Sequence, residues 1–121
     1  MDTITLSTAV AYGNESLTGS VTLPASDVLQ GVMEANTSYA ELKVFNTPPQ
    51  AVVIANGGAV DVSVRLKFDT TKYAFFTVPA DRSIVVPGFL NVNNLTTLQG
   101  VEAIDIKTAS STADVTYVIV Y

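Results

Sequence analysis

Hydrophobic and polar residues alternate strictly along residues 60–68 of this chain. The apolar positions are Val60, Val62, Val64, Leu66 and Phe68. Because successive side chains of a β-strand point to opposite faces of a sheet, this pattern predicts a strand with one buried and one wet face. We expect the central three of these apolar residues to be buried, and Ser63, Arg65 and Lys67 to face solvent or an interface.

The same period of two recurs in shorter segments that are bounded by turn residues. Strands are predicted over residues 3–11, 17–23, 39–45, 51–55, 73–78, 83–86 and 103–108, with a last one over 115–121. Pro24 is expected to end the second strand, and the strand over 83–86, which Pro79 and Pro87 bracket, is expected at a sheet edge. The last strand is apolar at both parities, which predicts a central position buried on both faces.

Two connections and one segment are less regular. The Asn-Gly-Gly sequence at residues 56–58 favours a tight hairpin, because these residues accept positive φ angles, and residues 110–113 are expected to form another hairpin loop. Residues 26–34 are the best helix candidate, since their apolar residues fall at helical spacing behind a possible Ser or Asp cap. Gly31 disfavours that helix, and a loop is the alternative.

These elements predict one all-β domain over residues 1–121. Eight or nine short strands with short connections, and at most one short helix near residues 26–34, indicate an antiparallel β-sandwich of jelly-roll-like type. The length of 121 residues fits a single domain.

Composition narrows the function classes. Apolar residues make up 48% of the chain and charged residues 14%, which is too apolar for a disordered protein. No apolar run approaches the roughly 18 residues of a membrane-spanning helix. The six basic residues are spread through a chain of net charge −5, so neither nucleic acid nor an anionic membrane is expected as a partner. The N-terminal sequence has no basic segment and predicts no signal peptide, which favours synthesis in a cytoplasm.

Candidate chemistry is sparse, because the chain contains neither His nor Cys. Their absence excludes disulfides and thiol or imidazole nucleophile systems, and it makes zinc an unexpected ligand. Glu102 and Asp105 are close in sequence, but opposite parity places them on different sheet faces. Asp69 and Asp81 lie in loops that lack the acid density of a calcium site. We therefore expect no catalytic, cofactor-binding or metal-binding residues, no cofactor and no enzymatic activity.

Aromatic residues offer two further readings. Tyr73, Phe75 and Phe76 form a strip of the kind that stacks on sugars, but such modules usually rely on Trp, and packing inside the sandwich or at an interface is favoured. Tyr117 and Tyr121 share one strand face. They fit either a subunit contact or a core position with the hydroxyl at the rim.

The C-terminal half of the chain carries a family resemblance. Its parts are residues 73–80 (YAFFTVPA), 84–88 (IVVPG), 100–107 (GVEAIDIK) and the closing strand over 115–121. In its succession of strands and turns it is similar to small β-sandwich virion proteins of tailed bacteriophages, which include head decoration (cement) proteins and related head or tail accessory proteins. No functional residue is carried across.

The resemblance implies a non-enzymatic structural protein located in a virion. Its partners would be a major capsid protein or other virion proteins, together with further copies of itself in a homo-oligomer. The alternative is a receptor- or carbohydrate-binding β-sandwich module of a phage tail. Fold alone does not separate the two, because sandwiches host both functions.

Overall fold

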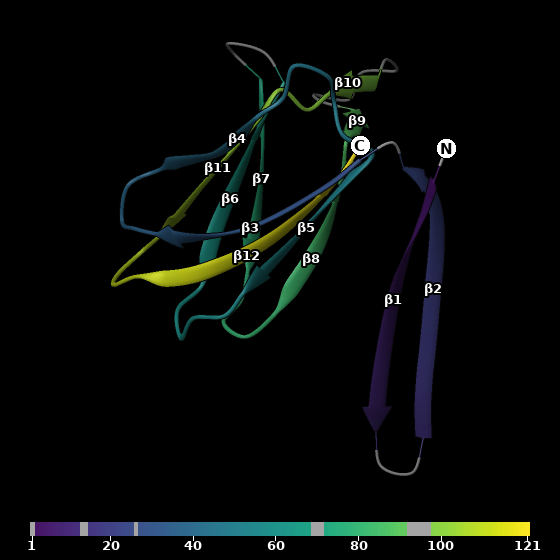
Figure 1. Cartoon of the computed structure of the whole chain (residues 1–121). Helices are drawn as coiled ribbons and strands as arrows, with labels where there is room; N and C mark the ends of the chain where they lie inside the picture. Colours follow the sequence, from purple (N-terminus) through teal and green to yellow (C-terminus); the bar gives the residue numbers. More distant parts are fainter. Residues whose placement is uncertain (1, 13–14, 26, 69–71, 92–97) are drawn as a thin grey trace.

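The computed structural model describes residues 2–12, 15–25, 27–68, 72–91 and 98–121, with side chains described for residues 5, 27–68, 72–89 and 99–121. Within these residues the chain forms strands and no helix, which confirms the predicted all-β class. Eight of the twelve strands build two four-stranded antiparallel sheets that face each other as a sandwich (Figure 1).

The two sheets have a jelly-roll order. One sheet runs in the order β3 (Val28–Ala35), β12 (Ala113–Val120), β5 (Ala51–Asn56) and β8 (Ser83–Pro87). The other sheet runs in the order β4 (Ala40–Val44), β11 (Ala103–Thr108), β6 (Val62–Lys67) and β7 (Tyr73–Val78). Counted along the chain, the eight strands therefore appear as 1-8-3-6 and 2-7-4-5, which is the double Greek key of a jelly roll.

The core lies between the two sheets and is built from the inward positions of each strand. Val62, Val64 and Leu66 of β6 are fully buried, as predicted, while Ser63, Arg65 and Lys67 are partly exposed on the outer face. Opposite them, the other sheet contributes a comparable aliphatic set. Its fully buried members include Val52, Ile54, Val86, Val115 and Ile119.

Most predicted strands are confirmed with shifts of one or two residues at their ends. The edge position of β8 and the central position of β12, between β3 and β5, are both confirmed. Burial of β12 on both faces is confirmed only in part, because Thr116 and Val118 on its outer face are partly exposed. Pro24 does not end its strand, since β2 continues to Ala25.

The helix expected over residues 26–34 is wrong. Residues 28–35 form strand β3, which pairs along its whole length with β12, from Val28 opposite Val120 to Ala35 opposite Ala113. The apolar residues that fit a helical period also fit a strand with apolar residues on both faces. Gly31 provides space in this strand, because the Tyr117 ring of β12 occupies the place where a side chain at position 31 would lie.

The two expected hairpins are wrong as well, since both connections cross between the sheets. The chain passes from β5 in one sheet to β6 in the other, and likewise from β11 to β12. Neither Gly57 nor Gly58 has a left-handed φ. A side chain at Gly58 would collide with Ala113, so this glycine provides space rather than a turn angle.

Asn56 fixes the first of these crossings. Its side chain is 2% exposed, and its amide nitrogen donates to the carbonyl oxygens of Val60 (2.8 Å) and Val78 (3.0 Å). Its amide oxygen accepts a hydrogen bond from the Gly58 N–H (2.9 Å). A buried amide that is satisfied at both ends ties the crossing loop to the end of β7.

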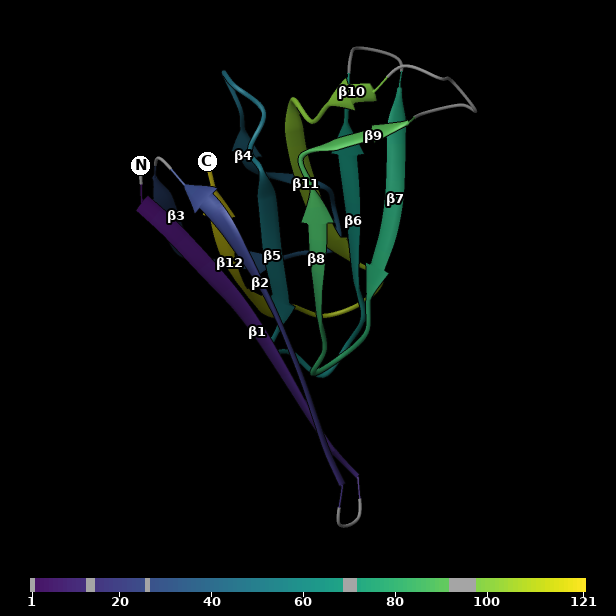
Figure 2. The same cartoon turned by 90° about the vertical axis from the view of Figure 1, so that its right-hand side faces the viewer.

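Strands β1 (Asp2–Tyr12) and β2 (Glu15–Ala25) form a separate antiparallel hairpin, which we call the arm. Within the described chain they pair only with each other. The arm starts near the C-terminus and stands beside the sandwich, with the ends of both strands that lead into the turn reaching past it (Figures 1 and 2). The jelly roll is thus complete without the arm. Two short strands, β9 (Phe89–Asn91) and β10 (Leu98–Gly100), pair with each other as a separate antiparallel ribbon.

Candidate interaction surfaces

The acidic side chains of the described residues are not gathered into a metal-binding cluster. No cluster of three or more His, Cys, Asp or Glu side chains lies within reach of one ion in this part of the chain. Glu102 is exposed and lies just before β11, whereas Asp105 lies within that strand and is paired with Arg65. Asp81 is exposed, and Asp69 lies outside the described residues. The described residues include no helix that is long and apolar enough to cross a membrane.

The outer face of the sheet that contains β6 is charged and aromatic, and we call it the Arg65 face. The register of β11 beside β6 sets Asp105 opposite Arg65 and Lys107 opposite Ser63. The register of β7 on the other side sets Phe75 opposite Arg65 and Tyr73 opposite Lys67. The consecutive strands β6 and β7 and the distant strand β11 therefore bring their outward polar and aromatic positions together around Arg65.

The Arg65 guanidinium is held in place from several sides. Its Nη2 and Nε donate to the same carboxylate oxygen of Asp105 at 2.8 and 3.0 Å. Its Cζ lies 4.1 Å from the centre of the Tyr39 ring and 5.2 Å from that of Tyr73. The Lys107 ammonium shares the Tyr39 ring at 4.9 Å. This partly exposed network combines an ion pair with cation–π contacts, and it fixes a cation between two aromatic rings.

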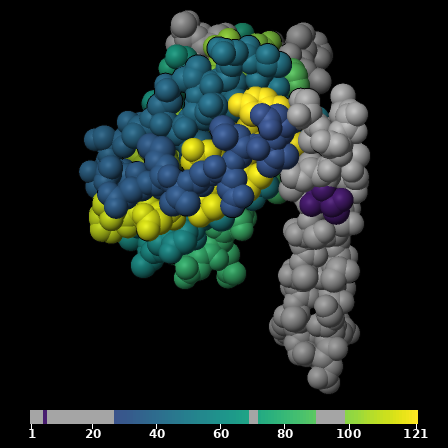
Figure 3. All heavy atoms as spheres, in the orientation of Figure 1, coloured from purple at the N-terminus to yellow at the C-terminus, as the bar shows by residue number. Residues whose placement is uncertain are grey.

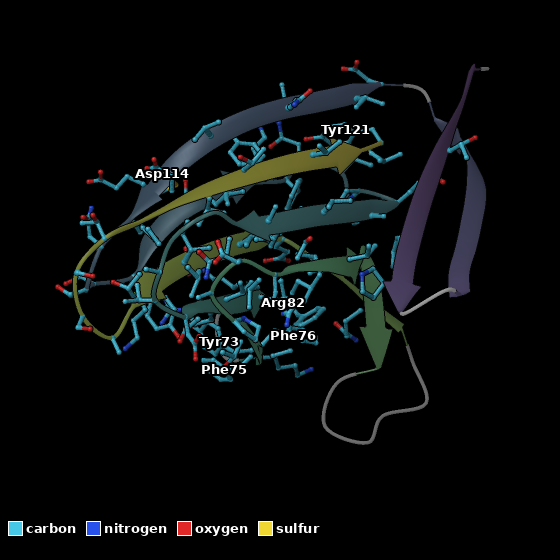
Figure 4. The ribbon with its side chains drawn as sticks, turned by 90° about the horizontal axis from the view of Figure 1, so that it is seen from below. Tyr73, Phe75, Phe76, Arg82, Asp114 and Tyr121 are labelled. Atoms are coloured by element: carbon cyan, nitrogen blue, oxygen red, sulfur yellow. The ribbon has the colours of Figure 1, made fainter. Side chains whose placement is uncertain are left out.

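The aromatic strip of β7 lies at the margin of this face. Phe75 is 65% exposed and its ring centre lies 6.3 Å from that of Tyr73. Figure 4 shows both side chains projecting from the sandwich on the side away from β12. The expectation that the strip packs inside the sandwich is therefore wrong for Phe75, and an interface role stays a prediction. Phe76 points inward beside Val64, but it lies on an edge strand and is 36% exposed.

The outer face of the other sheet is aliphatic, and we call it the valine face. Three successive rows of outward positions run across β3, β12, β5 and β8. They are Val28–Val120–Ala51–Pro87, then Gln30–Val118–Val53–Val85, then Val32–Thr116–Ala55–Ser83. None of these twelve residues is charged, and Val32 is 68% exposed and Val85 55% exposed. Strand β3, blue in Figure 3, occupies the front of that view with yellow atoms of the C-terminal strand beside it.

Charge on the valine face is confined to one end of the sheet. Glu34 and Asp114 face each other in the fourth row, and Figure 4 places Asp114 at the opposite end of β12 from Tyr121. At the other end, nearest the base of the arm, Ala51 and Val120 are buried although neither belongs to the central core cluster. The most exposed apolar residues of this face, Val32 and Val85, therefore lie in its two inner rows, while Val28 in the end row is 44% exposed.

The two C-terminal tyrosines are core residues. Tyr117 and Tyr121 are partly buried and pack against the central cluster, and the Tyr121 ring makes an edge-on contact with Phe45 at 6.3 Å between ring centres. Of the two readings offered by the sequence, core packing is confirmed. Tyr121 also borders an open hollow beside β3 and β4, where Asp27 and Lys43 lie among the lining residues.

The register of the arm sorts its sequence into two kinds of face. Apolar positions of the two strands stand opposite each other: Ile4 with Leu23, Leu6 with Val21, and Val10 with Leu17. The alternate positions pair Thr5 with Thr22 and Ser7 with Ser20. The first face is therefore mainly aliphatic by position, although the Thr8–Gly19 row interrupts it and Asp2 and Glu15 lie in its two end rows. The other face is made of small residues, most of them polar.

Sequence reasoning predicted most single strands but not these surfaces. The polar parity of residues 61–67 and of 105–107 was visible, yet only the pairing of β6 with β11 joins Lys107 to Arg65. Likewise, the last strand is apolar at both parities and is predicted to be buried on both faces. The four-stranded sheet instead leaves its Val118 partly exposed on the outer face.

Comparison of the sequence with models of known protein families and with curated proteins gave no match. The function is therefore inferred from the fold and from the three surfaces described above: the arm, the valine face and the Arg65 face.

Proposed function

We propose that this chain is a non-enzymatic structural subunit of a virion, which acts by binding a major capsid protein or another virion protein. Capsid decoration or cementing, or an accessory role between head and tail, is the specific form that the resemblance of the C-terminal half favours. The jelly-roll order of the two sheets supports this proposal, because viral capsid domains are among the proteins that use this architecture.

The observation that carries the proposal is the arm. A two-stranded hairpin is at best marginally stable when it stands alone in water, yet this one has eleven residues in each strand and pairs with no other described strand. A protein that keeps such a hairpin beside a complete jelly roll gains from it when another molecule covers it. This feature favours assembly over catalysis.

The test is to locate the protein in particles. A portal or major capsid gene beside its gene, and peptides of this chain in purified particles from the same source, are the expected results. If mass spectrometry detects the other shell proteins of those particles but no peptide of this chain, the proposal is contradicted.

A carbohydrate- or receptor-binding module is the second candidate function. The observation that favours it is the exposed aromatic pair Tyr73 and Phe75 beside the ordered Arg65 guanidinium, because aromatic rings stack on sugars and Arg donates to their hydroxyls. A glycan array with the purified chain separates the two candidates. Specific binding that Phe75→Ala abolishes would favour this second function, with Thr77→Ala on the same strand face as the control.

A further inference from the structure

The arm and the valine face have matching chemistry. The arm has acidic residues only at Asp2 and Glu15, at the two ends of the ribbon, and no basic residue. The first three rows of the valine face are also uncharged. Contact between these rows and the uncharged rows of the arm's aliphatic face, from Ile4–Leu23 to Val10–Leu17, removes apolar area from water without burying an unpaired charge. This is the condition for a favourable interface.

The sandwich of the same copy does not cover the whole arm. Figure 2 shows β1 and β2 passing in front of the sheet that contains β3 and β5 and running on past its strands. In Figure 1 that end of the arm stands clear of β8. The part of the ribbon that leads into the turn therefore needs a surface from another molecule.

The lengths of the arm and of the sheet set the area that one contact, or two reciprocal contacts, can bury. Eleven residues per strand make a ribbon about 36 Å long, compared with about 27 Å for the eight residues of β3 or β12. The sheet limits the overlap to about 27 Å by about 10 Å, so one ribbon face on one sheet buries about 540 Å² in total, counted over both surfaces. A single contact of this size is too small for a stable pair, whereas two reciprocal contacts reach about 1,100 Å², above the roughly 1,000 Å² that a specific interface should exceed.

We propose that two copies of this chain exchange arms, each arm laying its aliphatic face across the valine face of the other copy. This inference rests on the proposed assembly role and names the first partner, a second copy of the same chain. Reciprocal exchange makes a closed two-fold dimer, the commonest symmetric oligomer. Packing face to face is preferred to pairing at a strand edge, because edge pairing would leave both apolar faces in water.

The test measures association of the full-length chain by sedimentation at micromolar concentration. Leu6→Thr with Val21→Thr makes the aliphatic face of the arm polar and places β-branched Thr, which is compatible with a strand, at both positions. Its control is Ser7→Thr with Ser20→Thr on the opposite face. A separate double variant, Val32→Thr with Val85→Thr, changes the exposed part of the valine face, and Phe75→Thr on the other sheet is its control.

The wild-type chain and both controls are expected to be dimers, and each of the two test variants is expected to weaken the dimer by about a hundredfold. Circular dichroism of each variant verifies that it is folded. A wild-type chain that stays monomeric overturns the proposal. So does a dimer that survives Val32→Thr with Val85→Thr, because this outcome indicates edge pairing or another docking face.

The two proposals fail separately. If the chain is found in particles but the purified protein is monomeric, the arm exchange is wrong and the structural role stands. If the chain forms the arm-exchanged dimer but is missing from particles, the dimer stands and the virion role is wrong.

Discussion

The two outer faces of the jelly roll are built from the same kind of strand, yet they are chemically opposite. Around Arg65, cations, a carboxylate and aromatic rings form a partly exposed network. On the valine face, three rows across four strands carry no charge. A surface held by ion pairs and ring contacts is satisfied in water, whereas an exposed aliphatic sheet is not. Under the proposed assembly role, this difference favours the valine face for a lasting contact and the Arg65 face for a hydrated or reversible one.

The largest expected effect lies beneath both faces. Leu66→Ala removes a fully buried side chain from the core that the two sheets share, and it should lower the free energy of unfolding by about 2–5 kcal/mol. Denaturant unfolding monitored by circular dichroism measures this. Ser63→Ala, an outward position of the same strand, is the control, and a loss below about 0.5 kcal/mol for Leu66→Ala would contradict the assignment of inner and outer positions.

A second change tests what holds the two sheets together. Asn56→Ala leaves the carbonyls of Val60 and Val78 and the Gly58 N–H without their side-chain partner. The expected loss of unfolding free energy is about 2–3 kcal/mol, because buried polar groups become unsatisfied. Asn46→Ala, at an exposed position, should change it little. Equal effects from the two variants would show that the crossing loop does not depend on Asn56.

A smaller effect is expected on the Arg65 face. Arg65→Ala removes the ion pair to Asp105, whose side chain is 14% exposed, together with both ring contacts. We expect a loss of about 1 kcal/mol, reduced in high salt. Lys67→Ala, on the same strand face, is the control and should cost less. If the two variants cost the same in unfolding measurements, the network around Arg65 contributes no net stability.

The smallest effect is expected on the valine face. Val85→Thr, at a 55% exposed position, should change the unfolding free energy by less than about 0.5 kcal/mol when measured in dilute solution. Val86→Thr, the next residue, places a hydroxyl in the core and should cost at least about 1 kcal/mol. A large loss for Val85→Thr under dilute conditions would mean that this position is covered within a single copy.

The fold class was predictable because each strand carries its own period-two pattern. The alternation in β6 is sufficient by itself to predict its buried and exposed faces. Its pairing with β11 and β7 agrees with that assignment. Residues 28–35 were not predictable in this way. Their apolar residues satisfy both a helical and an extended period. The choice is made by pairing with β12, whose residues are between 78 (Ala35 to Ala113) and 92 (Val28 to Val120) positions away.

The candidate surfaces were less predictable than the strands, because they depend on which strands become neighbours. Lys107 and Arg65 are forty-two positions apart, and only sheet order brings them together. The crossings after Asn56 and Thr108 have the residues of hairpin turns, but the strands they join belong to different sheets. Local turn chemistry indicates that the chain reverses and does not indicate into which sheet it continues.

The position of β12 has a consequence for the order of folding. Both β3 and β5 pair with this strand, which follows every other strand in the chain, so their sheet cannot close until β12 is available. Contacts between such distant segments slow folding, whereas a hairpin of adjacent strands forms in microseconds. During synthesis the first twenty-five residues can therefore pair long before the jelly roll does. Until β12 emerges, β3 has no partner strand and β5, which also pairs with β8, keeps one open edge. This interval is therefore the period of greatest risk of aggregation.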